Sequence, residues 1–159
     1  MTHRLRLAEP ADVHVIADLI RGLARFEKLE HEVTLTDELL AAGLFGPRPY
    51  AEAVLAEVER HAAGFALFFH NFSTFLGRPG IYLEDLFVVP EHRGKGIGRS
   101  LLAHLAHLAV ERGCGRLEWA VLDWNSEAIA FYERLGARPN SEWTTYRVAG
   151  EALDRLARE

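Results

Sequence analysis

The segment Arg93-Gly94-Lys95-Gly96-Ile97-Gly98 decides how this chain folds. It follows the mostly apolar stretch Ile81–Val89 and opens a stretch ending at Gly113 whose apolar residues recur at helical spacing. Glycines let the backbone approach a ligand closely, and the first turn of a helix has free N–H groups and a positive dipole end. A strand, a glycine turn and a helix in this order predict a binding site for phosphate or pyrophosphate.

The spacing of the glycines distinguishes this loop from two other phosphate loops. A Walker A loop needs Gly-x-x-x-x-Gly-Lys-Ser/Thr, and a dinucleotide fingerprint needs G-x-G-x-x-G near the first strand of a Rossmann unit. Here the glycines run G-x-G-x-G, more than halfway along the chain. A tight turn without a ligand is the alternative, but three glycines beside Arg93, Lys95 and Arg99 exceed what a turn requires.

Length and composition predict one soluble domain over residues 1–159. The formal charge of −5, from 18 basic and 23 acidic residues, disfavours nucleic-acid binding. No apolar run approaches the ~18 residues of a membrane-spanning helix. The single cysteine, Cys114, excludes an internal disulfide framework and fits a reducing compartment, so we expect a cytoplasmic protein.

Hydrophobic patterning predicts a mixed-sheet α/β fold, because strands and helices mix without strict alternation. The expected strands are Arg4–Ala8, Ala53–Glu59, Gly64–Phe72, Ile81–Val89, Arg116–Leu122 and Thr144–Val148. The expected helices are Val13–Ala24, Asp37–Leu44 with Thr36 as its N-cap, Ile97–Gly113, Ser126–Leu135 and Glu151–Arg158.

Several motifs together resemble the GNAT superfamily of N-acetyltransferases, and within it the spermidine/spermine and thialysine acetyltransferase group. They are the loop 93–98, Tyr82–Val88, Asp123-Trp124-Asn125, Ala128-Ile129-Ala130-Phe131-Tyr132 and, more weakly, Leu23–Glu27. The resemblance implies a GNAT fold, acetyl-CoA as the cosubstrate, a small amine as the acceptor and a homodimer.

The resemblance also implies which residues bind coenzyme A. The loop binds the pyrophosphate through Arg93, Gly94, Lys95, Gly96, Ile97, Gly98 and Arg99. The preceding strand carries a bulge and splays from its neighbour, so that the backbone of Leu86, Phe87 and Val88 binds the pantetheine arm. Asn125 and Ala128, at the start of a helix, complete the set, and a simple N-cap role for Asn125 is compatible with this contact.

Acetyl transfer to an amine needs a proton acceptor for the ammonium and a proton donor for the leaving thiolate. The resemblance points to Tyr132 as the general acid, and the alternative is a packed core aromatic. Glu84 is the expected base, acting through a water, and the alternative is an edge-strand charge. Glu84 and Asp85 are neighbours in a strand and point to opposite faces, so at most one faces a given cavity.

The substrate amine is expected to meet an acidic rim of Glu27, Glu84 and Glu142, with Glu118, Trp119 and Ala120 lining the groove. A solvated loop is the alternative for Glu27. No metal is expected. Two other functions remain open, namely acetylation of a protein lysine or N-terminus and a sensor that binds acetyl-CoA without turnover.

Overall fold

The computed structural model describes residues 2–159. The chain forms two compact units, of which the first ends at Ala120 and the second is Val121–Glu159. The strands, all in the first unit, are β1 (His3–Leu7), β2 (Glu52–Val58), β3 (His61–Ser73), β4 (Arg78–Val88) and β5 (Leu117–Trp119). The first unit's α-helices are α1 (Val13–Phe26), α2 (Asp37–Phe45) and α3 (Ile97–Glu111), and its 3-10 turns are Pro10–Asp12, Glu30–Glu32 and Pro90–His92.

The five strands form one mixed sheet in the order β1-β2-β3-β4-β5. The first four strands pair antiparallel, whereas β5 pairs parallel to β4. The parallel pair requires a crossover connection, and α3 supplies it. The predicted mixed-sheet α/β fold is therefore confirmed.

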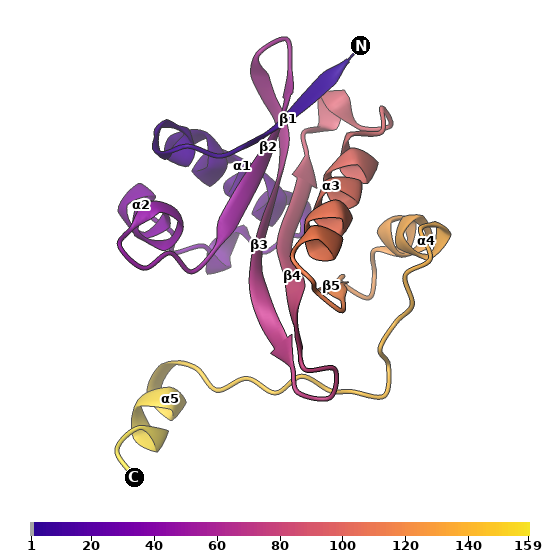
Figure 1. Ribbon diagram of the computed structural model, residues 1–159. Coiled ribbons are helices and arrows are strands. Elements are labelled where there is room, and N and C mark those ends of the chain that lie inside the picture. The colour runs from indigo at the N-terminus through magenta and orange to yellow at the C-terminus, as the bar shows by residue number, and fades with distance from the viewer. Residues whose placement is uncertain (1) are drawn as a thin grey trace. The chain divides into compact units, whose positions relative to one another are not determined.

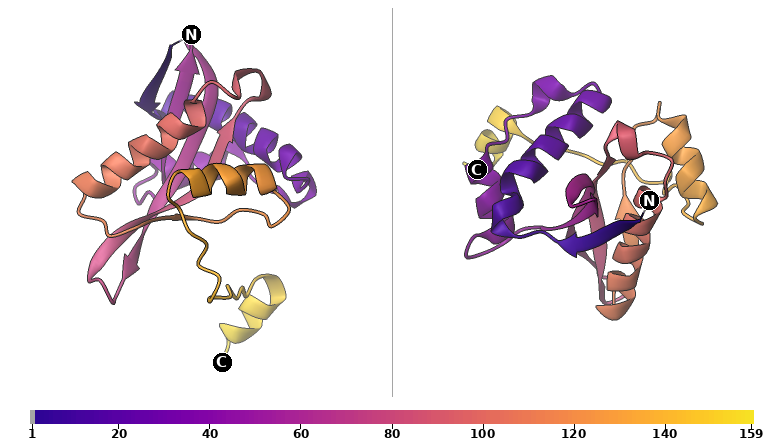
Figure 2. Two further views of the ribbon diagram at one scale, coloured as in Figure 1. Left: turned by 90° about the vertical axis from the view of Figure 1, so that its right-hand side faces the viewer. Right: turned by 90° about the horizontal axis from the view of Figure 1, so that it is seen from above.

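Helices cover both faces of the sheet. In Figure 1, α1 and α2 lie on one side of the strands and α3 lies on the other, and the view from above in Figure 2 agrees. The face under α1 and α2 holds a buried cluster in which Ile16 of α1 and Leu40 of α2 meet Phe65 of β3 and Phe87 of β4. Ile81 and Leu101 are fully buried in the same unit, and α3 packs against β4.

Two local features place the first helices as the sequence requires. The hydroxyl of Thr36 accepts a hydrogen bond from the backbone N–H of Leu39 at 3.2 Å, which confirms the predicted N-cap of α2. In α1, Gly22 lies against the ring of Phe87. A Cβ at that position would lie 2.9 Å from a ring carbon, so glycine allows α1 to approach β4 closely.

The second unit contains two helices, α4 (Ser126–Arg134) and α5 (Gly150–Leu156). The strand predicted over Thr144–Val148 does not form in the structure. A strand needs a neighbour to pair its N–H and C=O groups, and residues 144–148 pair with none of the five strands of the sheet. The last strand of the sheet is also shorter than predicted, because β5 pairs with β4 over only three residues.

No helix among residues 2–159 combines the length and the apolar character that crossing a membrane demands.

Candidate active site

Strand β4 carries a bulge at Glu84. Its pairing with β3 passes from Leu67 opposite Asp85 to Phe68 opposite Leu83, which leaves Glu84 as the extra residue. The bulge lies where β5 stops pairing, since the last residue pair between β4 and β5 is Leu83 with Trp119. The bulge and the splayed neighbour expected from the resemblance are thus both present.

Beyond the bulge, β4 is open on one side. β4 continues for five residues, Glu84–Val88, past its last pairing with β5, and from Asp85 onward its other side is paired with β3. In a strand, the N–H and C=O groups of successive residues point to alternate sides. Val89 donates to Ala63 of β3, so Phe87 also faces β3, and the open side presents the groups of Leu86 and Val88. A ligand that carries its own amides can pair with such an edge.

The loop after β4 also presents free N–H groups. Gly94 and Gly96 have φ angles of +73° and +83°, a conformation that glycine adopts without strain. Within residues 2–159, the backbone N–H groups from Gly94 to Arg99 donate to no backbone carbonyl, and the first bond of α3 runs from Ser100 N–H to Gly96 O at 3.0 Å. A Cβ at either Gly94 or Gly96 would meet no atom within 4 Å, so the space beside them is open.

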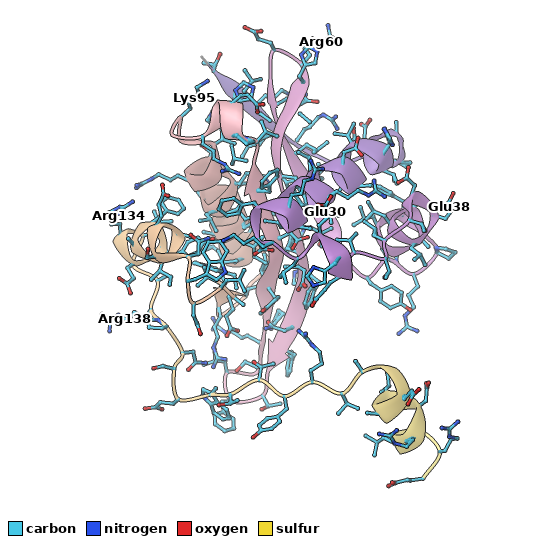
Figure 3. All side chains as sticks on the ribbon, turned by 180° about the vertical axis from the view of Figure 1, so that it is seen from behind. Glu30, Glu38, Arg60, Lys95, Arg134 and Arg138 are labelled. Atoms are coloured by element: carbon cyan, nitrogen blue, oxygen red, sulfur yellow. The ribbon has the colours of Figure 1, made fainter. Side chains whose placement is uncertain are left out.

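The basic side chains of the loop differ in their partners. Arg93 turns back toward the sheet, donates from Nε to the carbonyl of Val88 at 2.9 Å, and lies over the rings of Phe26 and Phe87. Lys95 donates to the carbonyl of Glu91 at 3.0 Å, and Figure 3 shows its side chain at the outer edge of the loop. Arg93 therefore joins the end of β4 to the end of α1 in addition to bringing positive charge.

Two carboxylates near the bulge act on a third. Burial, together with the negative charges of Glu84 and Glu27, raises the pKa of Asp85 to about 6. Burial also raises the pKa of Glu27. A pKa near 6 leaves Asp85 ionised at neutral pH yet able to accept a proton, which suits a base for an ammonium group.

The end of α1 places Glu27 in this group. Glu27 caps the helix, and the N–H groups of Lys28 and Leu29 donate to the carbonyls of Arg25 and Ala24 at 3.1 and 2.9 Å. This is a Schellman motif, in which the residue after the cap is usually glycine. Here that residue is Lys28, with φ +62°, so the turn holds a non-glycine residue in a strained conformation beside the acidic group.

Asp85 is the site residue that the sequence interpretation missed. Asp85 pairs with Leu67, which lies on the face covered by α1 and α2, and the end of α1 brings Glu27 toward it. The available signal was an acid in an otherwise apolar strand, and Glu84 and Asp85 shared that signal equally. Only the position of α1 distinguishes them.

The same face continues toward β5. Tyr82 lies opposite Glu118, and burial and then the charges of Glu84 and Glu118 raise the pKa of Tyr82. Side chains alternate along a strand, so Trp119 shares the face of Leu83 instead, and Ala120 ends the first unit. Within residues 2–159, no group of three or more His, Cys, Asp or Glu residues is arranged to hold a metal ion.

The remaining expected site residues lie in the second unit. Asn125 caps α4, where its side-chain oxygen accepts a hydrogen bond from Ala128 N–H at 3.2 Å, so the N-cap role is confirmed. Tyr132 is on α4 and its ring lies 5.6 Å, centroid to centroid, from that of Phe131. Glu142 follows α4 outside any helix or strand.

Comparisons with known proteins agree with this geometry. Residues 16–137 match the model of the acetyltransferase (GNAT) family, a range that covers the bulge, the loop and α4. The chain is 39% identical to a thialysine N-epsilon-acetyltransferase of Mus musculus over 97% of this chain and 96% of the relative. It is 36% identical to an L-ornithine N5-acetyltransferase of Arabidopsis thaliana, with 98% of this chain and 88% of the relative covered.

Among solved structures, an integron cassette protein from the mobile metagenome of V. cholerae matches with a TM-score of 0.83 and 28% identity. The match covers 100% of this chain and 99% of the other. The open edge of β4, the glycine loop and these similarities lead to one conclusion. The chain belongs to the GNAT family of acetyltransferases and is an N-acetyltransferase.

Proposed function

We propose that this enzyme transfers the acetyl group of acetyl-CoA to a primary amine of a small molecule, such as a polyamine, a diamine or a thialysine-like compound. The observation that carries this proposal is the sequence of features along one segment of the first unit. An acidic group of Glu84 and Asp85 in β4 with Glu27 at the end of α1, an open strand edge and a loop of free N–H groups lie along the path from the bulge of β4 to the start of α3. The names of the relatives support an amine acceptor.

The residues of the first unit fit the cosubstrate. The free N–H groups from Gly94 to Arg99 suit a diphosphate, because they combine unpaired donors with the positive end of α3. The open edge at Leu86 and Val88 suits the amides of a pantetheine arm, and a backbone N–H of this edge is the proposed donor to the thioester carbonyl. The N–H of Phe87, expected in that role from the resemblance, faces β3. Acetyl-CoA supplies the activated acyl group.

The acidic group has two tasks in this proposal. Its negative charge attracts the substrate ammonium, and one of its carboxylates takes the ammonium proton so that the free amine can attack the thioester carbon. Glu84 is the proposed base through a water, and Asp85, with its pKa of about 6, is positioned to hold the amine or to receive that proton. Attack forms the C–N bond and breaks the C–S bond in a single ternary complex.

Tyr132 is the proposed acid that protonates the leaving thiolate. Asn125 and Ala128 are proposed to bind the cosubstrate, and Glu142 to contact the substrate. These roles rest on the resemblance. The resemblance also supports a homodimer, which light scattering after size-exclusion chromatography tests. Chain length supports a single catalytic domain over residues 1–159, and the single cysteine supports a cytoplasmic location.

The decisive experiment measures CoA release with spermidine, putrescine, thialysine, lysine and a basic peptide as acceptors. We expect turnover with at least one small amine, and a loss of about 100-fold or more in kcat for Tyr132→Phe. Tyr146→Phe makes the same chemical change in the same unit and should leave kcat unchanged. Glu84→Gln should shift the pH–rate profile, whereas Glu91→Gln, in the turn before the loop, should not.

Other outcomes identify the rival functions. Turnover of the peptide alone would establish a protein acetyltransferase. Stabilisation of the fold by CoA without release from any acceptor would establish a sensor. Full activity of Tyr132→Phe would remove Tyr132 from the mechanism without affecting the proposed reaction.

A further inference from the structure

A hydrogen bond between two side chains joins the first strand to the helix that follows the glycine loop. His3 Nε2 of β1 lies 2.8 Å from Ser100 Oγ of α3, although 97 positions of the chain separate the two residues. In Figures 1 and 2, the start of β1 and the glycine loop lie at the same end of the sheet. The contact therefore links an edge strand of the sheet to the element that is proposed to bind the diphosphate.

The strand pairing explains why His3 points toward α3. His3 pairs with Val58 of β2, and residues that lie directly opposite each other in two paired strands share one face of the sheet. Side chains alternate along β2, so Val58 lies on the face opposite to Ala53 and Leu55, which belong to the buried cluster under α1 and α2. His3 accordingly lies on the face that α3 covers.

Ser100 is bonded to the glycine loop as well as to β1. Its backbone N–H donates to the carbonyl of Gly96 at 3.0 Å, and Ser100 directly follows the free N–H groups of Gly94–Arg99. At the other end of those groups, Arg93 Nε donates to the carbonyl of Val88 at 2.9 Å. The free donors are thus held at both ends, to β4 through Arg93 and to β1 through Ser100.

The glycine loop needs such contacts because its backbone has few restraints of its own. Gly94, Gly96 and Gly98 alternate along it, and glycine loses more conformational freedom on ordering than any other residue. A site whose donors are already oriented loses less entropy when its ligand binds. The carbonyl of Gly96 is bonded to Ser100, so a contact that holds Ser100 in place also limits the motion of the loop.

We propose that His3 is a positioning residue for the cosubstrate. Its hydrogen bond to Ser100 holds the start of α3 against the sheet, so that the free N–H groups of the loop keep the orientation that the diphosphate of acetyl-CoA requires. An imidazole nitrogen can donate to a hydroxyl or accept from it, so the contact forms in either tautomer. The inference rests on the proposed function and adds to it a residue that lies far from the loop in the sequence.

The test measures the Kd for CoA by calorimetry, and the kinetics with acetyl-CoA and the acceptor that the wild type turns over fastest in the panel above. For His3→Leu we expect the Kd for CoA and the KM for acetyl-CoA to rise about 3- to 10-fold, the range for loss of one hydrogen bond. The kcat and the KM for the amine should stay unchanged, because the contact orients only the cosubstrate loop.

Two further variants separate the hydrogen bond from the bulk of the side chain. In His3→Gln the amide reaches about as far as the imidazole Nε2 and can donate or accept, so the affinity for CoA should return close to the wild-type value. Ser100→Ala removes the same bond from its other end and should weaken CoA binding as much as His3→Leu does. The double variant should bind CoA no more weakly than either single variant.

His61→Leu is the matched control. His61 also pairs with Val58, on the other side from His3, but its Nδ1 donates to the carbonyl of Glu59 in its own turn at 2.9 Å. The chemical change is the same and the affinity for CoA should stay at the wild-type value.

Four outcomes would overturn the inference and leave the proposed function intact. They are wild-type affinity for CoA in His3→Leu, equal weakening by His61→Leu, failure of His3→Gln to restore binding, and a rise in the KM for the amine as large as that for acetyl-CoA. Absence of both CoA binding and turnover in the wild type would instead overturn the proposed function.

Discussion

The two halves of β4 have the same neighbours on one side and different surroundings on the other. From Ile81 to Leu83 the strand is paired with β3 and β5, and Ile81 is fully buried. From Asp85 to Val88 it is paired with β3 alone, and the bulge residue Glu84 and its neighbour Asp85 give this half two acids. The first half has the features of a structural strand, and the second half leaves charges and hydrogen-bonding groups available to ligands.

The difference between the two halves shows that one strand can form a binding site and still contribute to the stability of the sheet. A bulge needs one extra residue, and here that residue, Glu84, marks the point where β5 departs. The open half still packs through Phe87, which reaches the core under α1. The residues before Glu84 therefore contribute mainly to stability, and those from Glu84 onward contribute mainly to ligand binding. Mutations in the first part should lower the unfolding free energy, and mutations in the second part should lower activity.

The largest expected effect is on stability, from Ile81→Ala in the closed half. Removing a fully buried isoleucine side chain costs about 2–5 kcal/mol of unfolding free energy, because the cavity it leaves collapses only in part. Glu84→Gln in the open half should change the unfolding free energy little. Urea denaturation of both variants measures the contrast.

The comparison between the halves would fail if Glu84→Gln destabilised the protein as much as Ile81→Ala. It would be sharpened if Ile81→Ala retained its KM for amine and acetyl-CoA at a temperature where the variant remains folded. That outcome would place the closed half outside the binding surfaces.

The next effect is a pH-dependent gain in stability from Asp85→Asn. The pKa of Asp85 in the folded protein is about 6, against 3.8 for the free side chain. Folding therefore favours the protonated form, and the wild type loses stability as the pH rises from about 4 through 6. Asparagine does not ionise, so the variant should be more stable above pH 6, by up to about 2–3 kcal/mol.

Melting temperatures of wild type and Asp85→Asn at several pH values between 3.5 and 8 measure this gain. The two curves should run parallel near pH 3.5 and separate between pH 4 and 6. A constant difference across the range would mean that Asp85 titrates as an ordinary exposed carboxylate. A more stable variant with lower turnover would identify Asp85 as a residue kept for activity at the expense of stability.

Much of this fold could be predicted because its signals are local. The apolar strand, the glycine loop and the helix that begins at Ile97 follow one another in the sequence, and so do Thr36 and the helix it caps. The strand predicted over Thr144–Val148 also had a suitable local pattern. It does not form, because a strand depends on a partner and residues 144–148 pair with none of the five strands.

The sequence predicted those parts of the site whose residues all lie in one continuous segment. The loop and the open edge of β4 both lie within Glu84–Arg99, so their residues could be named from the sequence. Asp85 needed the position of the end of α1, almost 60 residues earlier. The hydrogen bond from Asn71 across Gly80 to Glu118 joins three strands and has no local signature in the sequence.

The smallest expected effect on stability belongs to the loop itself, through Gly96→Ala. An alanine at φ +83° costs about 1–2 kcal/mol, and relief of that strain would move the N–H groups that precede α3. We therefore expect a modest fall in melting temperature together with weaker binding of CoA, measured by calorimetry. Gly43→Ala is the control, because Gly43 lies inside α2 with open space at its Cβ position, and alanine there should add about 0.5–1 kcal/mol.

The pair of glycine variants separates conformational strain from ligand binding. Gly43→Ala should raise the melting temperature and leave the Kd for CoA unchanged. Gly96→Ala should lower the melting temperature and raise the Kd for CoA. If Gly96→Ala lost stability but bound CoA as tightly as the wild type, the N–H groups of the loop would not be the diphosphate site. The cosubstrate would then bind through the strand edge of β4 alone. In that case the ligand-binding part of the chain would end at Val88 and would not include the glycine loop.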